Sequence, residues 1–250
     1  MSLDRSNHLT QEGVPAIEAE HVSLRYDQDL VVDDVSFQLA TGTLTALIGP
    51  NGAGKSTLFK GLLGLHPLTQ GRVQFHGQPL DEVRRQIAYL PQKSEVNWDF
   101  PLTVFELALM GRYPHLGWFK RPHKRDRELA LGALEKVEMQ DFARRQIQEL
   151  SGGQKQRAFL ARALAQAADY YFLDEAFQGI DARSADILWS ILASLRAQGK
   201  TILIVHHDLK TIDERFDHVV MIKRHLLAAG SPREVLSPEN LERAYPGVRA

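Results

Sequence analysis

The chain has 250 residues, of which 44% are hydrophobic and 24% are charged, and its formal net charge is −1. This composition is typical of a folded globular protein, and the length suits one large domain or one domain with an inserted lobe. The near-neutral charge gives no overall sign of a protein that binds nucleic acid. There is no cysteine, which excludes disulfides and thiolate metal sites and fits a reducing compartment.

The beginning of the sequence is polar. Residues 1–13 contain no apolar segment of the kind that secretory signals carry, so we expect a disordered tail there. Elsewhere no apolar run approaches the roughly eighteen residues that a transmembrane helix needs. If the protein works at a membrane, we therefore expect another chain to supply the spanning helices.

The first part of the chain is rich in strands. Period-2 alternation or short apolar runs predict strands at residues 16–25, 31–39, 44–48, 71–77 and 87–90. After Gln92 the pattern changes, and amphipathic helices are predicted at 104–110 and 124–137. We expect residues 93–150 to form a helical subdomain inserted between two parts of an α/β core, residues 14–92 and 151–250.

Strands and helices alternate in the last hundred residues. Apolar strands are predicted at 170–173 and 201–205, helices at 155–168 and 184–198, and a hairpin at 219–229. Two short helices are predicted after Ser231-Pro232 and Ser237-Pro238. This alternation favours a largely parallel sheet, to which the strand-rich beginning adds an antiparallel part.

Residues 49–57 carry the first chemical motif. The run Gly49-Pro50-Asn51-Gly52-Ala53-Gly54-Lys55-Ser56-Thr57 fits the phosphate-binding loop pattern G-x-x-x-x-G-K-[ST] and lies between an apolar strand and a predicted helix. Glycines let backbone N–H groups converge on phosphate oxygens, and a helix N-terminus attracts them. We expect Lys55 to reach the β- and γ-phosphates and Ser56 to hold Mg²⁺. An ordinary glycine turn is the alternative, which the strand–loop–helix context disfavours.

Asp174 and Glu175 follow the apolar strand at 170–173. A carboxylate at the end of such a strand can hold a Mg²⁺-bound water while Ser56 ligates the metal, so this role is predicted for Asp174. Glu175 is placed to polarise an attacking water as a general base. The alternative is a pair of acids at a solvated strand end.

A second glycine-rich segment, Leu150-Ser151-Gly152-Gly153-Gln154, opens the helix predicted at 155–168. Ser151 can cap this helix, and the two glycines let the backbone approach an anion. Plain capping of a structural helix explains these residues equally well. We call residues 150–154 the signature segment.

The order of these three motifs resembles the ATP-binding cassette family, and the resemblance covers residues 18–230. It implies a P-loop NTPase (RecA-like) α/β core with an N-terminal antiparallel β subdomain and an inserted α-helical subdomain. It also implies ATP and Mg²⁺ as cofactors. In that family the signature segment of one subunit closes on ATP held by the phosphate-binding loop of another. One copy of each motif therefore implies a homodimer or a paired homologue.

Other positions match the family one by one. Gln92 matches the glutamine that senses Mg²⁺ and connects to the helical lobe, and His207 matches the switch histidine at the γ-phosphate. Asp181 matches the aspartate at the dimer interface, although it also fits a helix N-terminal acid. Tyr26 matches the aromatic residue that stacks on adenine, although a lone tyrosine at a strand end is commonly a packing residue.

The resemblance thus gives a full set of site residues. It assigns nucleotide contacts to Tyr26, Gly49, Pro50, Asn51, Gly52, Ala53, Gly54, Lys55, Ser56, Thr57, Gln92, Ser151, Gly152, Gly153, Gln154, Asp174 and Asp181. Mg²⁺ is assigned to Ser56, Gln92 and Asp174, and catalysis to Glu175 and His207. Two positions depart from the family, since Ala176 replaces a proline and His206 replaces a threonine. Neither departure removes a group that does chemistry, so we expect activity.

The helical part carries a narrower resemblance. Residues 92–104 and 110–122 resemble the ATPases of manganese, zinc and iron importers. The aromatic residues there could form an apolar docking patch for a membrane partner or fill the core of the lobe, and we expect a mixture of both. These residues are Trp98, Phe100, Trp118 and Phe119.

The sequence therefore predicts an ATP-hydrolysing subunit of a metal-ion importer, bound peripherally to the cytoplasmic face of the membrane. The predicted partners are a second copy of the chain, a transmembrane permease and, indirectly, an extracytoplasmic metal-binding protein. The direction of transport rests on the resemblance alone. Because the histidines are scattered without metal-ligand spacing, we expect Mg²⁺, not the transported metal, to bind this chain.

Three alternatives stay open. The chain could serve another importer, of the ferric siderophore or cobalamin type. It could be a cassette ATPase outside transport, acting on nucleic acid or ribosomes, although it shows no second cassette, coiled coil or basic surface. It could also be a nucleotide-gated module without turnover, which Glu175 argues against.

Overall fold

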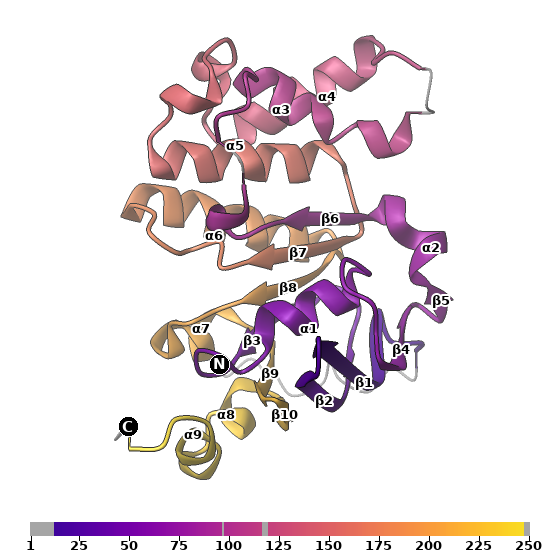
Figure 1. Cartoon of the computed structure of the whole chain (residues 1–250). Helices are drawn as coiled ribbons and strands as arrows, with labels where there is room; N and C mark the ends of the chain where they lie inside the picture. The colour runs from indigo at the N-terminus through magenta and orange to yellow at the C-terminus, as the bar shows by residue number, and fades with distance from the viewer. Residues whose placement is uncertain (1–12, 97, 117–119, 248–250) are drawn as a thin grey trace, which may run out of the picture.

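Two β-sheets and a layer of helices make up the protein in this computed structural model, which describes residues 13–96, 98–116 and 120–247 (Figure 1). Residues 1–12 of the expected tail lie outside the described part. In Figure 1 the helices α3, α4 and α5 lie above the strands of the larger sheet, and the smaller sheet lies at the lower right with α1 beside it.

The larger sheet has six strands in the order β10-β9-β3-β8-β7-β6. Its strands are β3 (Leu44–Ile48), β6 (Ile87–Leu90), β7 (Tyr170–Asp174), β8 (Thr201–Val205), β9 (His218–Lys223) and β10 (His225–Gly230). All neighbouring pairs are parallel except β9 and β10. The strands β3, β7 and β8 are buried at every position, as expected for a parallel sheet covered on both faces.

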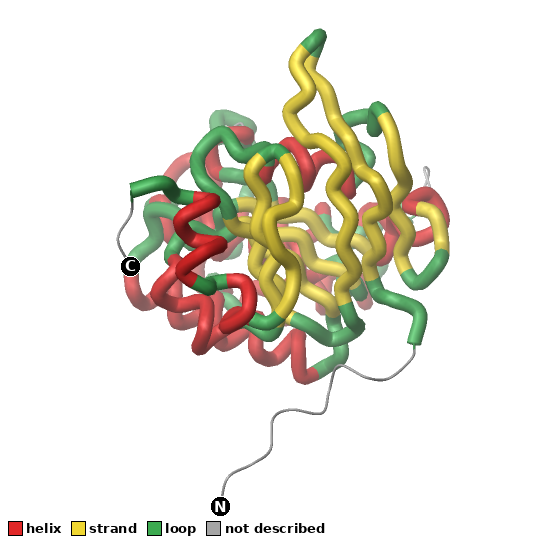
Figure 2. Tube along the Cα trace, turned by 90° about the horizontal axis from the view of Figure 1, so that it is seen from below, coloured by secondary structure: helices red, strands yellow, loops and turns green. Residues whose placement is uncertain are grey.

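The smaller sheet is antiparallel, with the order β2-β1-β4-β5. Its strands are β1 (Ile17–Tyr26), β2 (Asp29–Leu39), β4 (Gln70–Phe75) and β5 (Gln78–Pro79), and the strands of both sheets are seen together in Figure 2. Helix α1 (Lys55–Leu62) packs between the two sheets, because Leu58, Phe59 and Leu62 share one buried cluster with Leu24 of β1 and Phe172 of β7.

The helical layer packs on the other face of the larger sheet. It contains α3 (Val104–Met110), α4 (Lys124–Lys136) and α5 (Gly152–Ala165), next to α6 (Ala182–Ala197). Leu107, Leu134 and Leu160 share a buried cluster with Ala46 of β3 and Leu173 of β7. The short helices are α2 (Leu80–Val83), α7 (Ile212–Arg215), α8 (Pro232–Val235) and α9 (Pro238–Ala244), and 3₁₀ turns are formed by Arg84–Gln86, Lys93–Glu95, Tyr113–His115, Gln140–Phe142, Ile147–Glu149 and Leu209–Thr211.

The fold class predicted from the sequence is confirmed, with some differences in element boundaries. The helix expected at 155–168 begins earlier, at Gly152, because Ser151 and Gln154 form a capping box at its start. It ends at Ala165. The elements β5, α2 and α7 were not predicted, since runs of two to four residues carry no periodicity. Among the described residues, no helix combines the length and the hydrophobicity that crossing a bilayer requires.

Candidate functional site

The phosphate-binding loop joins β3 to α1 and is shaped by its glycines. Gly54 caps α1 with a φ of 91° and no side-chain hydrogen bond, so the first N–H groups of the helix are left for a ligand. A Cβ at Gly49 would lie 2.2 Å from the carbonyl oxygen of Ile222, and one at Gly54 would lie 2.9 Å from that of Val31. The neighbouring strands β9 and β2 therefore leave no room for a side chain at these two positions.

Lys55 is the first residue of α1, and only 6% of its surface is exposed. Its ammonium donates hydrogen bonds to the carbonyl oxygens of Gly49 and Pro50, both at 2.9 Å. Burial lowers the pKa of Lys55, while the charges of Glu175 and Asp174 oppose that shift. The loop thus encloses its own positive charge and places it close to both carboxylates.

Asp174 ends β7 and is completely buried. Neither carboxylate oxygen meets a hydrogen-bond partner of normal geometry within the described residues. Burial, followed by the charge of Glu175, raises the pKa of Asp174 to about 6, and the Ser56 hydroxyl acts in the opposite direction. An unpaired buried carboxylate beside a hydroxyl is a donor set that suits a hard divalent cation such as Mg²⁺.

Glu175 lies between two of the predicted site residues. The amide nitrogen of Gln92 donates to one carboxylate oxygen at 2.5 Å, and His207 Nε2 lies 2.5 Å from the other. The side chain of Glu175 is 11% exposed and that of His207 is 38% exposed. Glu175 also has a φ of 51°, a conformation that is uncommon outside glycine and that turns the chain sharply after β7.

His206, next to His207, has a structural environment. It is buried, its Nε2 lies 2.9 Å from the Thr211 hydroxyl, and its ring contacts those of Phe177, Trp189 and Phe216. Burial lowers the pKa of His206 to about 4, so the ring is neutral at pH 7. Of the two adjacent histidines, His207 is the one whose ring contacts Glu175.

The signature segment forms the start of α5. Ser151 accepts from the backbone N–H of Gln154, and the Gln154 side chain accepts from the backbone N–H of Ser151. Asp181 lies beside it, because a Cβ at Gly153 would be 2.4 Å from an Asp181 carboxylate oxygen. Asp181 caps α6 by accepting from the backbone and hydroxyl of Ser184, and these bonds lower its pKa.

Tyr26 ends β1 and is 43% exposed. Its ring lies against that of His66, with the ring centroids 4.4 Å apart and the planes inclined by 31°. The packing alternative and the adenine-stacking role are therefore compatible, since one face can pack on His66 while a large part of the residue remains open.

The structure brings most of the predicted residues into two groups. Lys55, Ser56, Asp174, Glu175, Gln92 and His207 lie around the end of β7. The signature segment and Asp181 lie at the starts of α5 and α6. The segment of residues 93–96 and 98 links the groups, because Glu95 pairs with Lys60 of α1 at 2.6 Å and a Cβ at Gly152 would lie 2.7 Å from Lys93 Nζ.

No sequence motif indicated the roles of Lys93 and Glu95. Trp98 ties the same segment to α5, with its ring 5.0 Å from that of Phe159 and 5.0 Å from the Lys155 ammonium. Trp98 thus packs in the lobe, whereas Phe100 is 56% exposed. The other two aromatic residues of the predicted docking patch, Trp118 and Phe119, lie outside the described residues.

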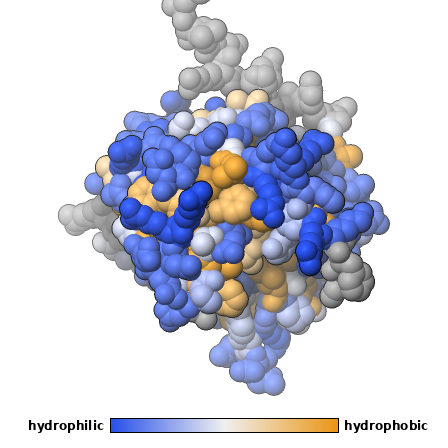
Figure 3. All heavy atoms as spheres, turned by 90° about the horizontal axis from the view of Figure 1, so that it is seen from above, coloured by the Kyte–Doolittle hydropathy of each residue, from blue (hydrophilic) through white to orange (hydrophobic). Residues whose placement is uncertain are grey.

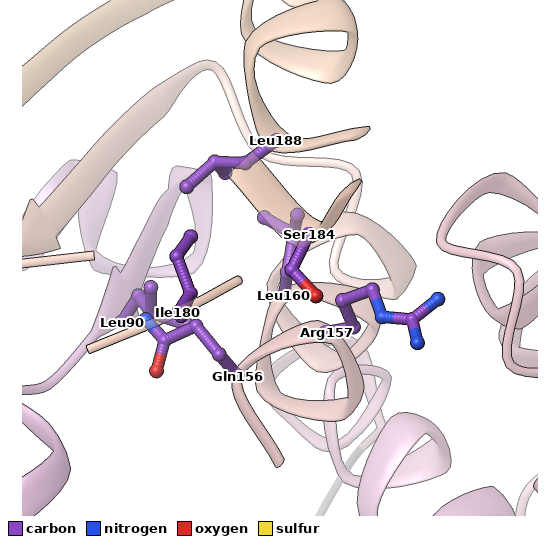
Figure 4. Close-up of a pocket in the computed structure, with 7 residues that line it drawn as sticks. All are labelled: Leu90, Gln156, Arg157, Leu160, Ile180, Ser184 and Leu188. Atoms are coloured by element: carbon purple, nitrogen blue, oxygen red, sulfur yellow. The ribbon is translucent and has the colours of Figure 1, made fainter. Parts of the chain in front are cut away.

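Two hollows lie near these elements. A cavity of about 10 Å³ between α5 and α6 has room for a single water at most, so it is no ligand site (Figure 4). A groove of about 540 Å³ runs along β6 between the sheet edge and the helical layer. It is lined by Asp81, Arg84, Arg85, Ile87, Tyr89, Met110, Gly111, Pro114, Arg162, Ala163 and Gln166.

Comparisons with known proteins find relatives that share most of the length of this chain. The zinc transport system ATP-binding protein TroB of Treponema pallidum is 49% identical over 232 residues, which cover 93% of this chain and 87% of TroB. The manganese transport system ATP-binding protein MntB of Listeria innocua is 49% identical over 224 residues, covering 90% of this chain and 93% of MntB. Among solved structures, the ADP conformation of MJ1267, an ATP-binding cassette of an ABC transporter, superposes with a TM-score of 0.78. It is 25% identical and covers 93% of this chain and 99% of that one.

A comparison with models of whole protein families agrees with these relatives. Residues 32–178 match the protein family described as ABC transporter. This range includes the phosphate-binding loop, Gln92, the signature segment, Asp174 and Glu175. The family predicted from the order of the motifs is confirmed, and the chain belongs to the ABC transporter family of ATP-binding subunits.

Proposed function

We propose that this ATPase drives uptake of a divalent transition metal, manganese or zinc, through a separate membrane permease. The names of the relatives support this cargo, because TroB is named for zinc transport and MntB for manganese transport. Iron, a ferric siderophore or cobalamin remains the alternative cargo. No cluster of three or more potential metal-ligating His, Cys, Asp or Glu side chains occurs in the described part of the chain.

The observation that carries the ATPase proposal is the position of Glu175. Its carboxylate is held from both sides by Gln92 and His207, next to the unpaired Asp174. We propose that Glu175 accepts a proton from the attacking water, and that His207 contacts the γ-phosphate. Lys55 and the N–H groups at the start of α1 bind the phosphates. Mg²⁺, when bound by Ser56, Asp174 and the Gln92 amide oxygen, neutralises phosphate charge.

The signature segment supports a dimeric mechanism. The N-terminus of α5 attracts an anion, but it belongs to a different group of residues from Lys55. We propose that a second copy of the chain presents its signature segment to the ATP held by the first. ATP then favours the closed dimer, because only that state offers both helix starts to one nucleotide. Asp181 lies at the same interface.

The helical unit at residues 93–150 is the proposed link to the permease. The groove along β6 carries Arg84, Arg85 and Arg162 against one acid, Asp81, so it suits a permease segment with acidic and apolar side chains. Exposed apolar residues also lie in the helical layer, among them Phe100, Tyr113, Leu129 and Leu131. The face seen from above shows apolar atoms surrounded by hydrophilic ones (Figure 3). In this arrangement the protein binds peripherally, at the cytoplasmic face of the membrane.

The catalytic proposal is tested by Glu175→Gln in the assembled complex with its permease. We expect ATP hydrolysis to fall by about a hundredfold or more while ATP still binds. Glu239→Gln on the exposed start of α9 is the matched control and should leave the rate unchanged. If Glu175→Gln retains more than a tenth of the rate, Glu175 is not the general base.

The cargo is tested separately, by uptake of radioactive manganese, zinc and iron in cells that lack this chain. We expect manganese or zinc uptake to be lost and to return with the wild-type chain but not with Glu175→Gln. Loss of iron uptake alone, or of siderophore or cobalamin uptake, would replace the proposed cargo. Unchanged uptake of all of them would favour a role outside transport.

A further inference from the structure

We propose that His66 is a positioning residue for Tyr26, and that it holds the tyrosine ring ready to stack on the base of the bound nucleotide. This inference rests on the adenine contact assigned to Tyr26. It goes further by naming the side chain that orders the aromatic platform, a role for which the sequence carries no motif. It also specifies the ligand part concerned, the base and not the phosphates.

His66 is held in place from the end of α1. Gly64 adopts a φ of 63°, and the backbone N–H groups of Leu65 and His66 donate to the carbonyl oxygen of Lys60 at 2.8 and 3.3 Å. This left-handed turn closes the helix and reverses the chain. The backbone of Thr69 then donates to the carbonyl oxygen of Ser23, so the segment after α1 runs back along the end of β1.

The imidazole itself is fixed by a second contact. His66 Nε2 lies 2.7 Å from the backbone carbonyl oxygen of Arg25. A carbonyl oxygen only accepts, so Nε2 carries the hydrogen and donates it, which sets the orientation of the ring. His66 is half-buried, and with this bond its ring forms a rigid surface under the neighbouring residue, Tyr26.

The contact between the two rings leaves Tyr26 partly free. The centroids are 4.4 Å apart with an inclination of 31°, so the two rings lie in direct contact in a tilted arrangement. Tyr26 is nevertheless 43% exposed. With one face covered by His66 and nearly half of the residue open, the ring presents its other face to a ligand.

Preorganisation gives this contact a functional effect. Without His66, the exposed side chain of Tyr26 at the tip of the hairpin would sample several rotamers, and ligand binding would have to order it. Removal of His66 should therefore lower the affinity for any nucleotide that carries a base, because stacking does not depend on the identity of the base. Binding of the phosphates alone, at the other end of α1, should not change.

The test compares ATP, GTP and inorganic triphosphate, each with Mg²⁺, binding to the full chain in a Glu175→Gln background. In His66→Ala we expect ATP and GTP affinity to fall by about three- to tenfold, and triphosphate affinity to stay the same. His66→Phe keeps a ring against Tyr26 and should restore ATP affinity to within about twofold. With Glu175 present, His66→Ala should raise KM for ATP without changing kcat.

Tyr26→Ala separates this inference from the assignment on which it rests. If Tyr26→Ala weakens ATP binding and His66→Ala does not, the role of His66 is wrong and the adenine contact stands. If His66→Ala weakens ATP and triphosphate equally, His66 has only a structural role and the inference is overturned. If Tyr26→Ala itself leaves ATP affinity unchanged, the adenine contact is wrong and the inference falls with it.

Discussion

The starts of α1 and α5 are both glycine-rich, yet they are built in opposite ways. Gly54 begins α1 in a left-handed conformation without any side-chain cap, and Lys55 folds back into the loop before it. At α5, Ser151 and Gln154 satisfy each other's backbone N–H groups in a capping box. The N–H groups at the start of α1 have no side-chain cap, whereas the start of α5 is capped by side chains of its own segment.

The two helix starts also differ in how deeply they are buried. Lys55 is 6% exposed and faces the buried, unpaired Asp174, whereas Ser151 is exposed. Burial strengthens the electrostatic interactions of a bound phosphate, while an exposed helix start contributes less. This difference supports the proposal that the phosphate-binding loop holds ATP in one subunit. In the same proposal, the signature segment contacts ATP that a second subunit brings to it.

Removal of the buried charge of Lys55 is expected to have the largest effect. Lys55→Met should weaken ATP binding by about 2–5 kcal/mol, since loss of one partner of a buried charged contact has effects of this size. Calorimetric titration of the purified chain with MgATP measures it. Lys60→Met, at the other end of the same helix, is the control and should bind ATP almost normally. Nearly equal affinities in the two variants would contradict the assignment of the phosphate site.

Asp174→Asn is expected to change the dependence of stability on pH. Burial raises the pKa of Asp174 from 3.8 to about 6, so between these values the folded state binds more protons than the unfolded state. The free energy of unfolding from this group therefore decreases as pH rises from about 4 to 6, and the loss is complete above pH 6. Asp174→Asn should stabilise the Mg²⁺-free protein by about 3 kcal/mol at pH 8, and less at pH 5.

Denaturant unfolding at both pH values, without Mg²⁺, measures this effect. Asp181→Asn provides a contrast, because the pKa of Asp181 is lowered by its bonds with Ser184 and its contribution to stability has the opposite sign. Stability from Asp181 is present at neutral pH and is lost as the pH falls through its folded pKa. An Asp174→Asn protein that is less stable than wild type at pH 8 would contradict the unpaired state of this carboxylate.

Ser151→Ala gives the smallest expected effect and tests the other helix start. Loss of the cap should lower the free energy of unfolding by about 1 kcal/mol, with ATP affinity of the single subunit unchanged. ATPase activity of the complex should fall further than that of Ser237→Ala, which removes an equivalent cap from α9. Equal activities in the two variants would mean that Ser151 is only a cap.

Local sequence was sufficient wherever one short segment carries the whole signal. The loop at 49–57 is surrounded by an apolar strand and a helix, as its pattern requires. Ser151, Asp181, Ser231 and Ser237 all lie at helix N-caps, where their side chains favour a helix start. The strands β3, β7 and β8 were found because they are buried on both faces and therefore uniformly apolar.

Contacts between segments that are far apart in the chain could not be predicted from local sequence. Lys60 and Glu95, Lys93 and Gly152, and Tyr26 and His66 are pairs that no pattern in the chain connects. The left-handed conformation of Glu175 also has no sequence signal, because glutamate rarely adopts it and the surrounding fold imposes it.

The family of this protein, its phosphate-binding loop and the types of residue available for chemistry could be read from the sequence, because those depend on local patterns. The meeting of Gln92, Glu175 and His207 depends on tertiary packing, since 83 residues separate the first two and 32 the last two. The physical reason is the strand order β3-β8-β7-β6, in which the helical crossovers bring the ends of strands far apart in the chain to one edge of the sheet.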